Sequence, residues 1–189
     1  MPVKRRLLIG ISGASGAPIA IELLRQLKEM DDVETHLIIT KGAALTIEQE
    51  TEYTTEDVKA LAHVCYENDA IGAQPASGSY RMEGMIIVPC SMKTAAGIVS
   101  GYSDNLLLRA ADVMLKERRK LVLIARESPL STIHLRNLYE LSRMGAVIMP
   151  PMLTWYNHPE NIGDCTRYTV SRILRQFDLD NNGYEWEGM

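Results

Sequence analysis

Residues whose chemistry suits ligand binding or catalysis gather directly after the apolar segments of this chain of 189 residues. They are 12–16 (SGASG), Thr40, Lys41, 90–94 (CSMKT), Arg126 and Glu127. Small residues and hydroxyls at the starts of helices leave backbone N–H groups accessible, and together with nearby cations these groups bind anions. The pattern therefore predicts a site for a phosphorylated ligand.

The segments that must position these residues alternate between strands and helices. Short apolar runs predict strands, and apolar residues at helical spacing predict helices. The predicted strands are residues 6–12, 33–40, 85–89, 121–125 and 146–149. The predicted helices are one around residues 19–27, a short one after Gly42, one beginning within 90–98, and others at 54–64, 105–120, 131–144 and 159–177. Residues 68–81 are predicted to form an ordered surface loop.

The strands are almost entirely apolar rather than alternating, which is typical of a parallel sheet covered by helices on both faces. We therefore predict one doubly wound α/β domain over residues 1–189, Rossmann-like or flavodoxin-like, with three layers and a mostly parallel sheet. Such sheets bind ligands at the carboxyl ends of their strands, where the strand order reverses. The candidate residues all lie at that edge.

Composition excludes several other classes of protein. Twenty Lys and Arg against 24 Asp and Glu give a net charge of −4, which lacks the basic footprint of a nucleic-acid-binding domain. No apolar stretch approaches the ~20 residues of a membrane-spanning helix. The three cysteines are scattered without CxxC spacing, which argues against a disulfide framework and a zinc site. We expect a cytoplasmic protein that needs no metal.

The glycines of the first turn do not match the common nucleotide-binding motifs. Gly10, Gly13 and Gly16 depart from GxGxxG, and no GxxxxGK[ST] occurs. Classical NAD binding and P-loop ATP hydrolysis are therefore disfavoured. From spacing alone, a structural explanation stays open, in which the glycines permit tight turns and the hydroxyls cap helices.

Taken together, the strand-end segments resemble one family over nearly the whole chain. The segments that carry the resemblance are GISGASGAP, ETHLIITKGA, QPASGSY, VPCSMKTAAGI, DNLLLRAADVMLKERRKLVL, ARESPLSTIHLRNL, GAVIMPP, WYNHPE and VSRIL. They are similar to the UbiX/Pad-type flavin prenyltransferases, formerly described as aromatic acid decarboxylase subunits. One departure is Ala70 and Ile71, which stand where some members have an aromatic residue.

The resemblance implies binding of FMN and transfer of a dimethylallyl group from dimethylallyl phosphate to N5 and C6 of reduced FMN, without a metal. It implies that the product, prenylated FMN, serves a UbiD-type decarboxylase, and that the chain forms a homo-oligomer, a dodecamer built from trimers. Two alternatives remain, a flavoprotein decarboxylase acting directly on aromatic acids and a non-catalytic FMN carrier.

The resemblance also assigns roles to individual positions. The implied FMN contacts are Gly13, Ala14, Ser15, Thr40, Ser91, Met92, Lys93, Thr94 and Arg126. The implied ligands of the donor phosphate, partly shared between subunits, are Arg109, Lys116, Arg126, Tyr156 and Arg172. Ser15, Glu50 and Glu127 are the implied proton-handling groups. Fixed cations suit this chemistry because negative charge builds on the departing phosphate, and a carboxylate suits removal of the C6 proton. Taken singly, Glu50 fits equally well as the cap of a surface helix.

Overall fold

Six strands form one sheet in the computed structural model, which describes residues 4–179, 183–186 and 188. The strands are β1 (Arg5–Ile11), β2 (Val33–Ile39), β3 (Val64–Tyr66), β4 (Gly84–Cys90), β5 (Lys120–Ala125) and β6 (Val147–Ile148). Their order is β3-β2-β1-β4-β5-β6, and every neighbouring pair is parallel. The order reverses between β1 and β4, so the predicted doubly wound sheet is confirmed and its switch point is located.

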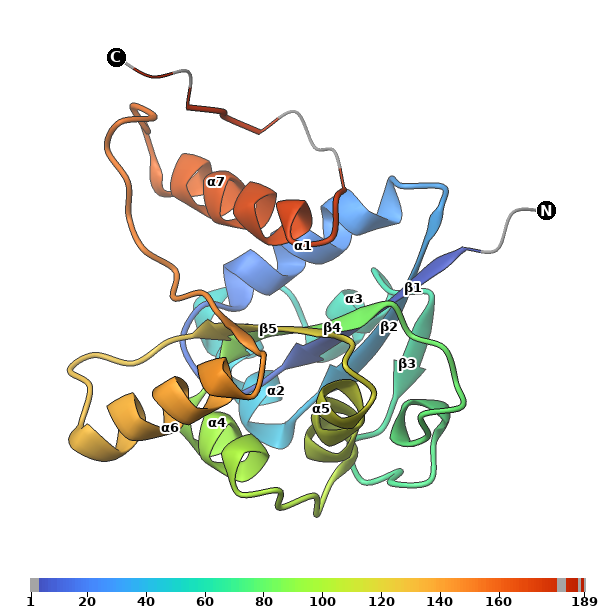
Figure 1. Cartoon of the computed structure of the whole chain (residues 1–189). Helices are drawn as coiled ribbons and strands as arrows, with labels where there is room; N and C mark the ends of the chain where they lie inside the picture. Colours follow the sequence, from blue (N-terminus) through green and yellow to red (C-terminus); the bar gives the residue numbers. More distant parts are fainter. Residues whose placement is uncertain (1–3, 180–182, 187, 189) are drawn as a thin grey trace.

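Helices cover both faces of the sheet. They are α1 (Ala17–Lys28), α2 (Lys41–Glu50), α3 (Thr55–Lys59), α4 (Met92–Val99), α5 (Leu106–Lys116), α6 (Thr132–Arg143) and α7 (Ile162–Arg175), with a 3₁₀ turn η1 (Gln74–Ala76). Figure 1 shows α1 and α7 above the sheet and α4, α5 and α6 below it. The three predicted layers are therefore present.

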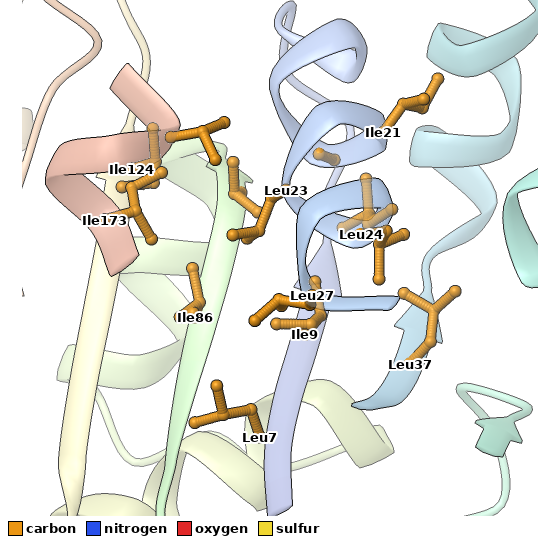
Figure 2. Close-up of a cluster of buried hydrophobic side chains, with 14 of the residues drawn as sticks. Leu7, Ile9, Ile21, Leu23, Leu24, Leu27, Leu37, Ile86, Ile124 and Ile173 are labelled. Atoms are coloured by element: carbon orange, nitrogen blue, oxygen red, sulfur yellow. The ribbon is translucent and has the colours of Figure 1, made fainter. Parts of the chain in front are cut away.

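Each strand divides its apolar side chains between two cores because successive side chains point to opposite faces. Leu7 and Ile9 of β1 pack with Leu24 of α1 and Ile173 of α7, whereas Leu8 belongs to the opposite cluster under α4 and α5. Figure 2 shows the first cluster, in which side chains of α1 fill the space above β1 and β4. Truncating a side chain as buried as Leu24 costs about 2–5 kcal/mol of folding free energy.

The segment from residue 54 to 66 differs from its prediction. Thr54 does cap a helix, in a capping box with Asp57, but α3 ends at Lys59 rather than continuing to residue 64. The chain then forms β3, in which Val64 and Tyr66 pair with β2 at the edge of the sheet. No apolar run in the sequence predicts this strand. The predicted helix was therefore wrong over residues 60–64.

Two smaller corrections concern boundaries and the loop. The helix predicted over 105–120 ends at Lys116, since Arg118 adopts a φ of 57° and Lys120 begins β5. Residues 68–81 form an ordered loop as predicted, and this loop also contains the η1 turn.

Candidate functional site

Two cavities open at the carboxyl edge of the sheet. We call the first, of about 750 Å³, the central cavity; its lining includes Ser12, Gly13, Ile39, Thr40, Lys41, Asn68, Asp69, Ser91, Lys93, Thr94, Tyr102 and Leu107. We call the second, of about 860 Å³, the side cavity; its lining includes Ser15, Gly16, Glu50, Arg126, Pro151, Met152, Leu153 and Ile162. The loop between β1 and α1 contributes to both cavities, so the two adjoin.

The start of α5 at the central cavity is closed by asparagines. Leu106 N–H donates to the Asn68 carbonyl (2.8 Å), and Leu107 N–H donates to Asn68 Oδ1 (3.1 Å). Leu108 N–H donates to Asn105 Oδ1 (3.0 Å). The first three N–H groups of α5 therefore have partners within the chain, and this helix is not the place for a bound anion.

The starts of α2 and α4 are different. Thr40 Oγ1 accepts from Ala43 N–H (3.1 Å), and Ser91 Oγ accepts from Thr94 N–H (3.3 Å), so each hydroxyl caps only the third N–H of its helix. The first two N–H groups of a helix have no partner within the helix itself. Lys41 and Lys93 add positive charge at these two starts. The geometry provides a place for a phosphate between α2 and α4.

Gly13 allows the β1–α1 loop to approach the first turn of α2 above the central cavity. A Cβ atom at Gly13 would lie 3.0 Å from the Cα and carbonyl carbon of Gly42. Since both contacts are with backbone, a larger residue at position 13 would force the loop away from the helix. The hydroxyl of Ser12 joins the same region to β4, because it donates to the Pro89 carbonyl (2.9 Å) and accepts from Ser91 N–H (2.8 Å).

Glu50 is the central group of the side cavity. Its Oε2 accepts from Gly16 N–H (2.8 Å) and Ala17 N–H (2.9 Å), so the end of α2 caps the start of α1. Burial by itself raises the pKa of Glu50, but the hydrogen bond from Ser15, the two N–H groups and the charge of Arg126 together lower it below the usual value. Glu50 is therefore a carboxylate held beside the Ser15 hydroxyl and the Arg126 guanidinium.

The other candidate residues at or just after the ends of β4 and β5 differ in how deeply they are buried. Met92 is buried and stands at the first position of α4, so its backbone N–H rather than its side chain faces the anion site. Cys90 is buried, and burial raises its pKa to about 12, which agrees with a role in the core. Glu127 is exposed, accepts from Ser128 N–H (3.0 Å) and lines neither cavity.

Four of the five predicted donor-phosphate ligands do not reach the side cavity of their own chain. Arg109 donates to the Ala76 carbonyl (3.2 Å) beside η1, and Lys116 pairs with Glu117. Tyr156 hydrogen-bonds to Tyr168 and contacts Trp186 edge-on at 5.5 Å between ring centroids. Arg172, on α7, lies near Tyr156, and it does not line the side cavity. Of the five predicted ligands, Arg126 is the one that lines this cavity together with Ser15 and Glu50.

Sequence reasoning missed the apolar wall of the side cavity. Pro151, Met152 and Leu153 follow β6, and Ile162 begins α7. Met152 and Ile162 have exposed fractions of 69% and 83%, which is unusual for large apolar side chains beside a charged cluster. The sequence could have indicated this apolar wall, because ligands bind after strand ends and these residues follow the strand predicted at 146–149.

Comparisons with known proteins identify the family of this chain. A model of the Flavoprotein family matches residues 1–175. A probable UbiX-like flavin prenyltransferase from Escherichia coli is 52% identical over 185 residues, which cover 97% of this chain and 94% of that protein. The chain belongs to the UbiX-like flavin prenyltransferase family.

Solved structures of UbiX-like proteins share the whole fold. The dodecameric FMN-dependent UbiX-like decarboxylase from Escherichia coli O157:H7 is 52% identical, with a TM-score of 0.95 over 97% of this chain and 100% of that one. AnUbiX (PadA1), in complex with FMN and dimethylallyl pyrophosphate, is 48% identical, with a TM-score of 0.96 over 98% and 99% of the two chains. The predicted family and fold are thus confirmed.

The central cavity suits the FMN that this family name implies. Its volume lies within the range of small-molecule sites, about 300–1,000 Å³. It offers two free helix starts with lysines for a phosphate, and Ile39, Leu107 and Leu108 as apolar walls for a ring. Among the described residues, no group of three or more His, Cys, Asp or Glu is placed to hold a metal ion, and no helix is long and apolar enough to cross a membrane.

Proposed function

We propose that this chain is a flavin prenyltransferase, which joins the dimethylallyl group of dimethylallyl phosphate to N5 and C6 of reduced FMN. The observation that carries the proposal is the placement of Ser15, Glu50 and Arg126 in a cavity adjoining the anion site at the starts of α2 and α4. The proton-handling cluster and the place for the flavin phosphate thereby lie on either side of the β1–α1 loop.

The central cavity would hold FMN through its phosphate. Thr40, Ser91 and Thr94 offer hydroxyls there, Lys93 a cation, and Met92 its backbone N–H. Gly13 and Ala14 would bring the β1–α1 loop against the ring, because position 13 carries no side chain to keep it away. Bound reduced flavin supplies the two nucleophilic positions, N5 and C6, that receive the prenyl group.

Glu50 and Ser15 would move the proton that C6 must lose when its new bond forms. The Glu50 carboxylate accepts a hydrogen bond from Ser15, and its pKa is lowered, so it is ionised at neutral pH. A hydroxyl linked to a carboxylate can pass on a proton without either group moving far. We assign Glu127, which lies one residue beyond Arg126, a secondary proton-handling role.

Arg126 would bind the phosphate that leaves when the allylic C–O bond breaks. A guanidinium suits this task because its planar fork makes two parallel hydrogen bonds to phosphate oxygens. Arg109, Lys116, Tyr156 and Arg172 lie away from the side cavity of their own chain, so we infer that neighbouring subunits bring them to it. A closed homo-oligomer follows from this arrangement, and we propose a dodecamer like that of the Escherichia coli O157:H7 protein.

The proposal also covers the recipient of the product, the metal requirement and the location of the protein. A prenylated flavin is a finished cofactor, so a second enzyme must use it, and we propose a UbiD-type decarboxylase as that recipient. We further propose that transfer needs no metal ion. All three cysteines are free thiols, which suits the cytoplasmic location predicted from the sequence.

The deciding experiment is incubation with reduced FMN and dimethylallyl phosphate under anaerobic conditions, followed by mass spectrometry of the extracted flavin. We expect the flavin to gain one C5H8 unit, equally with and without a chelator. An unchanged flavin mass with FMN-loaded protein would overturn the proposal. Release of CO2 from cinnamate-like or hydroxybenzoate-like acids by the protein alone would instead support the direct decarboxylase.

A further inference from the structure

A chain of hydrogen bonds begins at a buried histidine that the proposed reaction does not use. His36 of β2 is fully buried. Its Nε2 lies 2.8 Å from Glu34 Oε1, and its Nδ1 lies 2.9 Å from the hydroxyl of Tyr66 on β3. The His36 and Tyr66 rings also stack, with 5.7 Å between centroids and 11° between planes. The edge strand β3 and its neighbour β2 are therefore joined by side chains as well as by backbone.

Tyr66 extends this chain to the η1 turn. Its hydroxyl donates to Gln74 Oε1 (2.8 Å), and Gln74 is the first residue of η1. Burial and the neighbouring Tyr80 raise the pKa of Tyr66 to about 12, so the hydroxyl keeps its proton and remains a donor. One end of the turn is thus tied through the half-buried Tyr66 to the buried His36 in the sheet.

The other end of η1 holds Arg109. The carbonyl of Ala76, the last residue of the turn, accepts from Arg109 Nε (3.2 Å), and Asp112 accepts from Arg109 Nη1 (2.6 Å). A guanidinium has five N–H donors in a fixed plane. Partners hold two of the three nitrogens, Nε and Nη1, so the orientation of the guanidinium plane is set.

We propose that His36, Tyr66 and Gln74 are positioning residues for Arg109, fixing the η1 turn so that the guanidinium is presented to the phosphate of the prenyl donor. The inference rests on the proposed function, because it takes Arg109 as a ligand of that phosphate. Prepositioning matters here because an exposed arginine otherwise loses side-chain freedom each time it binds. The three residues themselves do not touch the substrate.

The test uses two variants of the full-length protein that break the bond between Tyr66 and Gln74 from its two sides. Tyr66→Phe removes the hydroxyl that bonds to both His36 and Gln74 and leaves the stacked ring. Gln74→Ala removes the acceptor at an exposed position and leaves the bond between His36 and Tyr66 in place. Loss of one such hydrogen bond should raise the KM for dimethylallyl phosphate about 3- to 10-fold. The kcat at saturating donor and the affinity for FMN should stay unchanged.

The control is Tyr139→Phe, which removes a phenolic hydroxyl from an exposed residue of α6 far from this chain of bonds. It should change none of these quantities. The decisive comparison repeats Tyr66→Phe in an Arg109→Ala background, where the KM should no longer respond, because coupled residues show non-additive effects.

Three outcomes would overturn the inference. An unchanged KM in both Tyr66→Phe and Gln74→Ala, or an equal rise with and without Arg109, would show that the hydrogen bonds do not act through Arg109. A fall in kcat and FMN affinity together would show a general structural role. In each of these cases the wild-type enzyme still prenylates FMN, whereas a wild-type enzyme that forms no prenylated flavin would overturn the proposed function and this inference with it.

Discussion

Replacing Glu50 by glutamine separates the structural role of this residue from its chemical one. One oxygen of the carboxylate accepts both the Gly16 and Ala17 N–H groups, and a glutamine carbonyl can accept the same two bonds. What is lost is the negative charge at the start of α1, which is worth about 0.3–1 kcal/mol and up to about 2 kcal/mol in a partly buried position. We therefore expect Glu50→Gln to lower the free energy of unfolding by about 1 kcal/mol.

A change of about 1 kcal/mol shifts the Tm of a domain of this size by about 2–4 °C, so the variant should fold and bind FMN. Glu50→Ala leaves two N–H groups without a partner at about 1 kcal/mol each, and it should be the less stable of the two variants. The pKa of Glu50 is lowered on folding, so its stabilising effect is present above its unfolded pKa, near 4.5, and is lost as the pH falls through the folded value. Glu50→Gln should lack that acid-side loss.

Prenyl transfer should respond far more strongly than stability. A glutamine cannot take a proton, and loss of a general base costs about 10²- to 10⁴-fold in rate. The assay is the rate of C5H8 addition to FMN by quenched-flow mass spectrometry, with FMN binding and Tm measured on the same preparation. If Glu50→Gln prenylated FMN at the wild-type rate with the Tm lowered as expected, Glu50 would be a helix cap only, and Glu127 would become the base to test.

Three further predictions address other parts of the site. Ser15→Ala should keep most FMN affinity, because the proposed phosphate site is at the starts of α2 and α4, yet slow prenyl transfer by about 10²-fold; equal losses of affinity and rate would contradict this. Gly13→Ala should destabilise the ligand-free protein by about 1–3 kcal/mol in thermal unfolding, because its Cβ would lie 3.0 Å from Gly42 backbone; an unchanged Tm would show that the β1–α1 loop can move away from α2 freely. Burial lowers the pKa of His36 despite its bond to a carboxylate. The contribution of neutral His36 to stability is therefore present above pH 6.5 and is lost as the pH drops through the folded pKa. Tm measured from pH 8 to 5 should decline less for His36→Gln than for the wild type.

The hydrophobic pattern was enough to predict the layer architecture and the edge of the sheet at which the candidate residues gather. Apolar runs such as residues 85–89 are unambiguous because a strand covered on both faces must be apolar throughout. The residues that follow such runs, including Ser15, Thr40 and Ser91, must then meet at one edge, because all parallel strands end there. Local pattern and long motifs were sufficient for these conclusions.

Which helix starts are already capped, and which stay open to a ligand, follows from contacts between distant segments. Glu50 lies 34 residues from the N–H of Gly16, and Asn68 lies 39 residues from that of Leu107, so no local pattern reveals that these two helix starts are already capped. The edge strand β3 escaped detection for the same reason, since three residues hold their conformation only through pairing with β2. Contacts between distant segments depend on how the layers pack, and hydrophobic periodicity specifies the layers without specifying which polar side chain crosses between them.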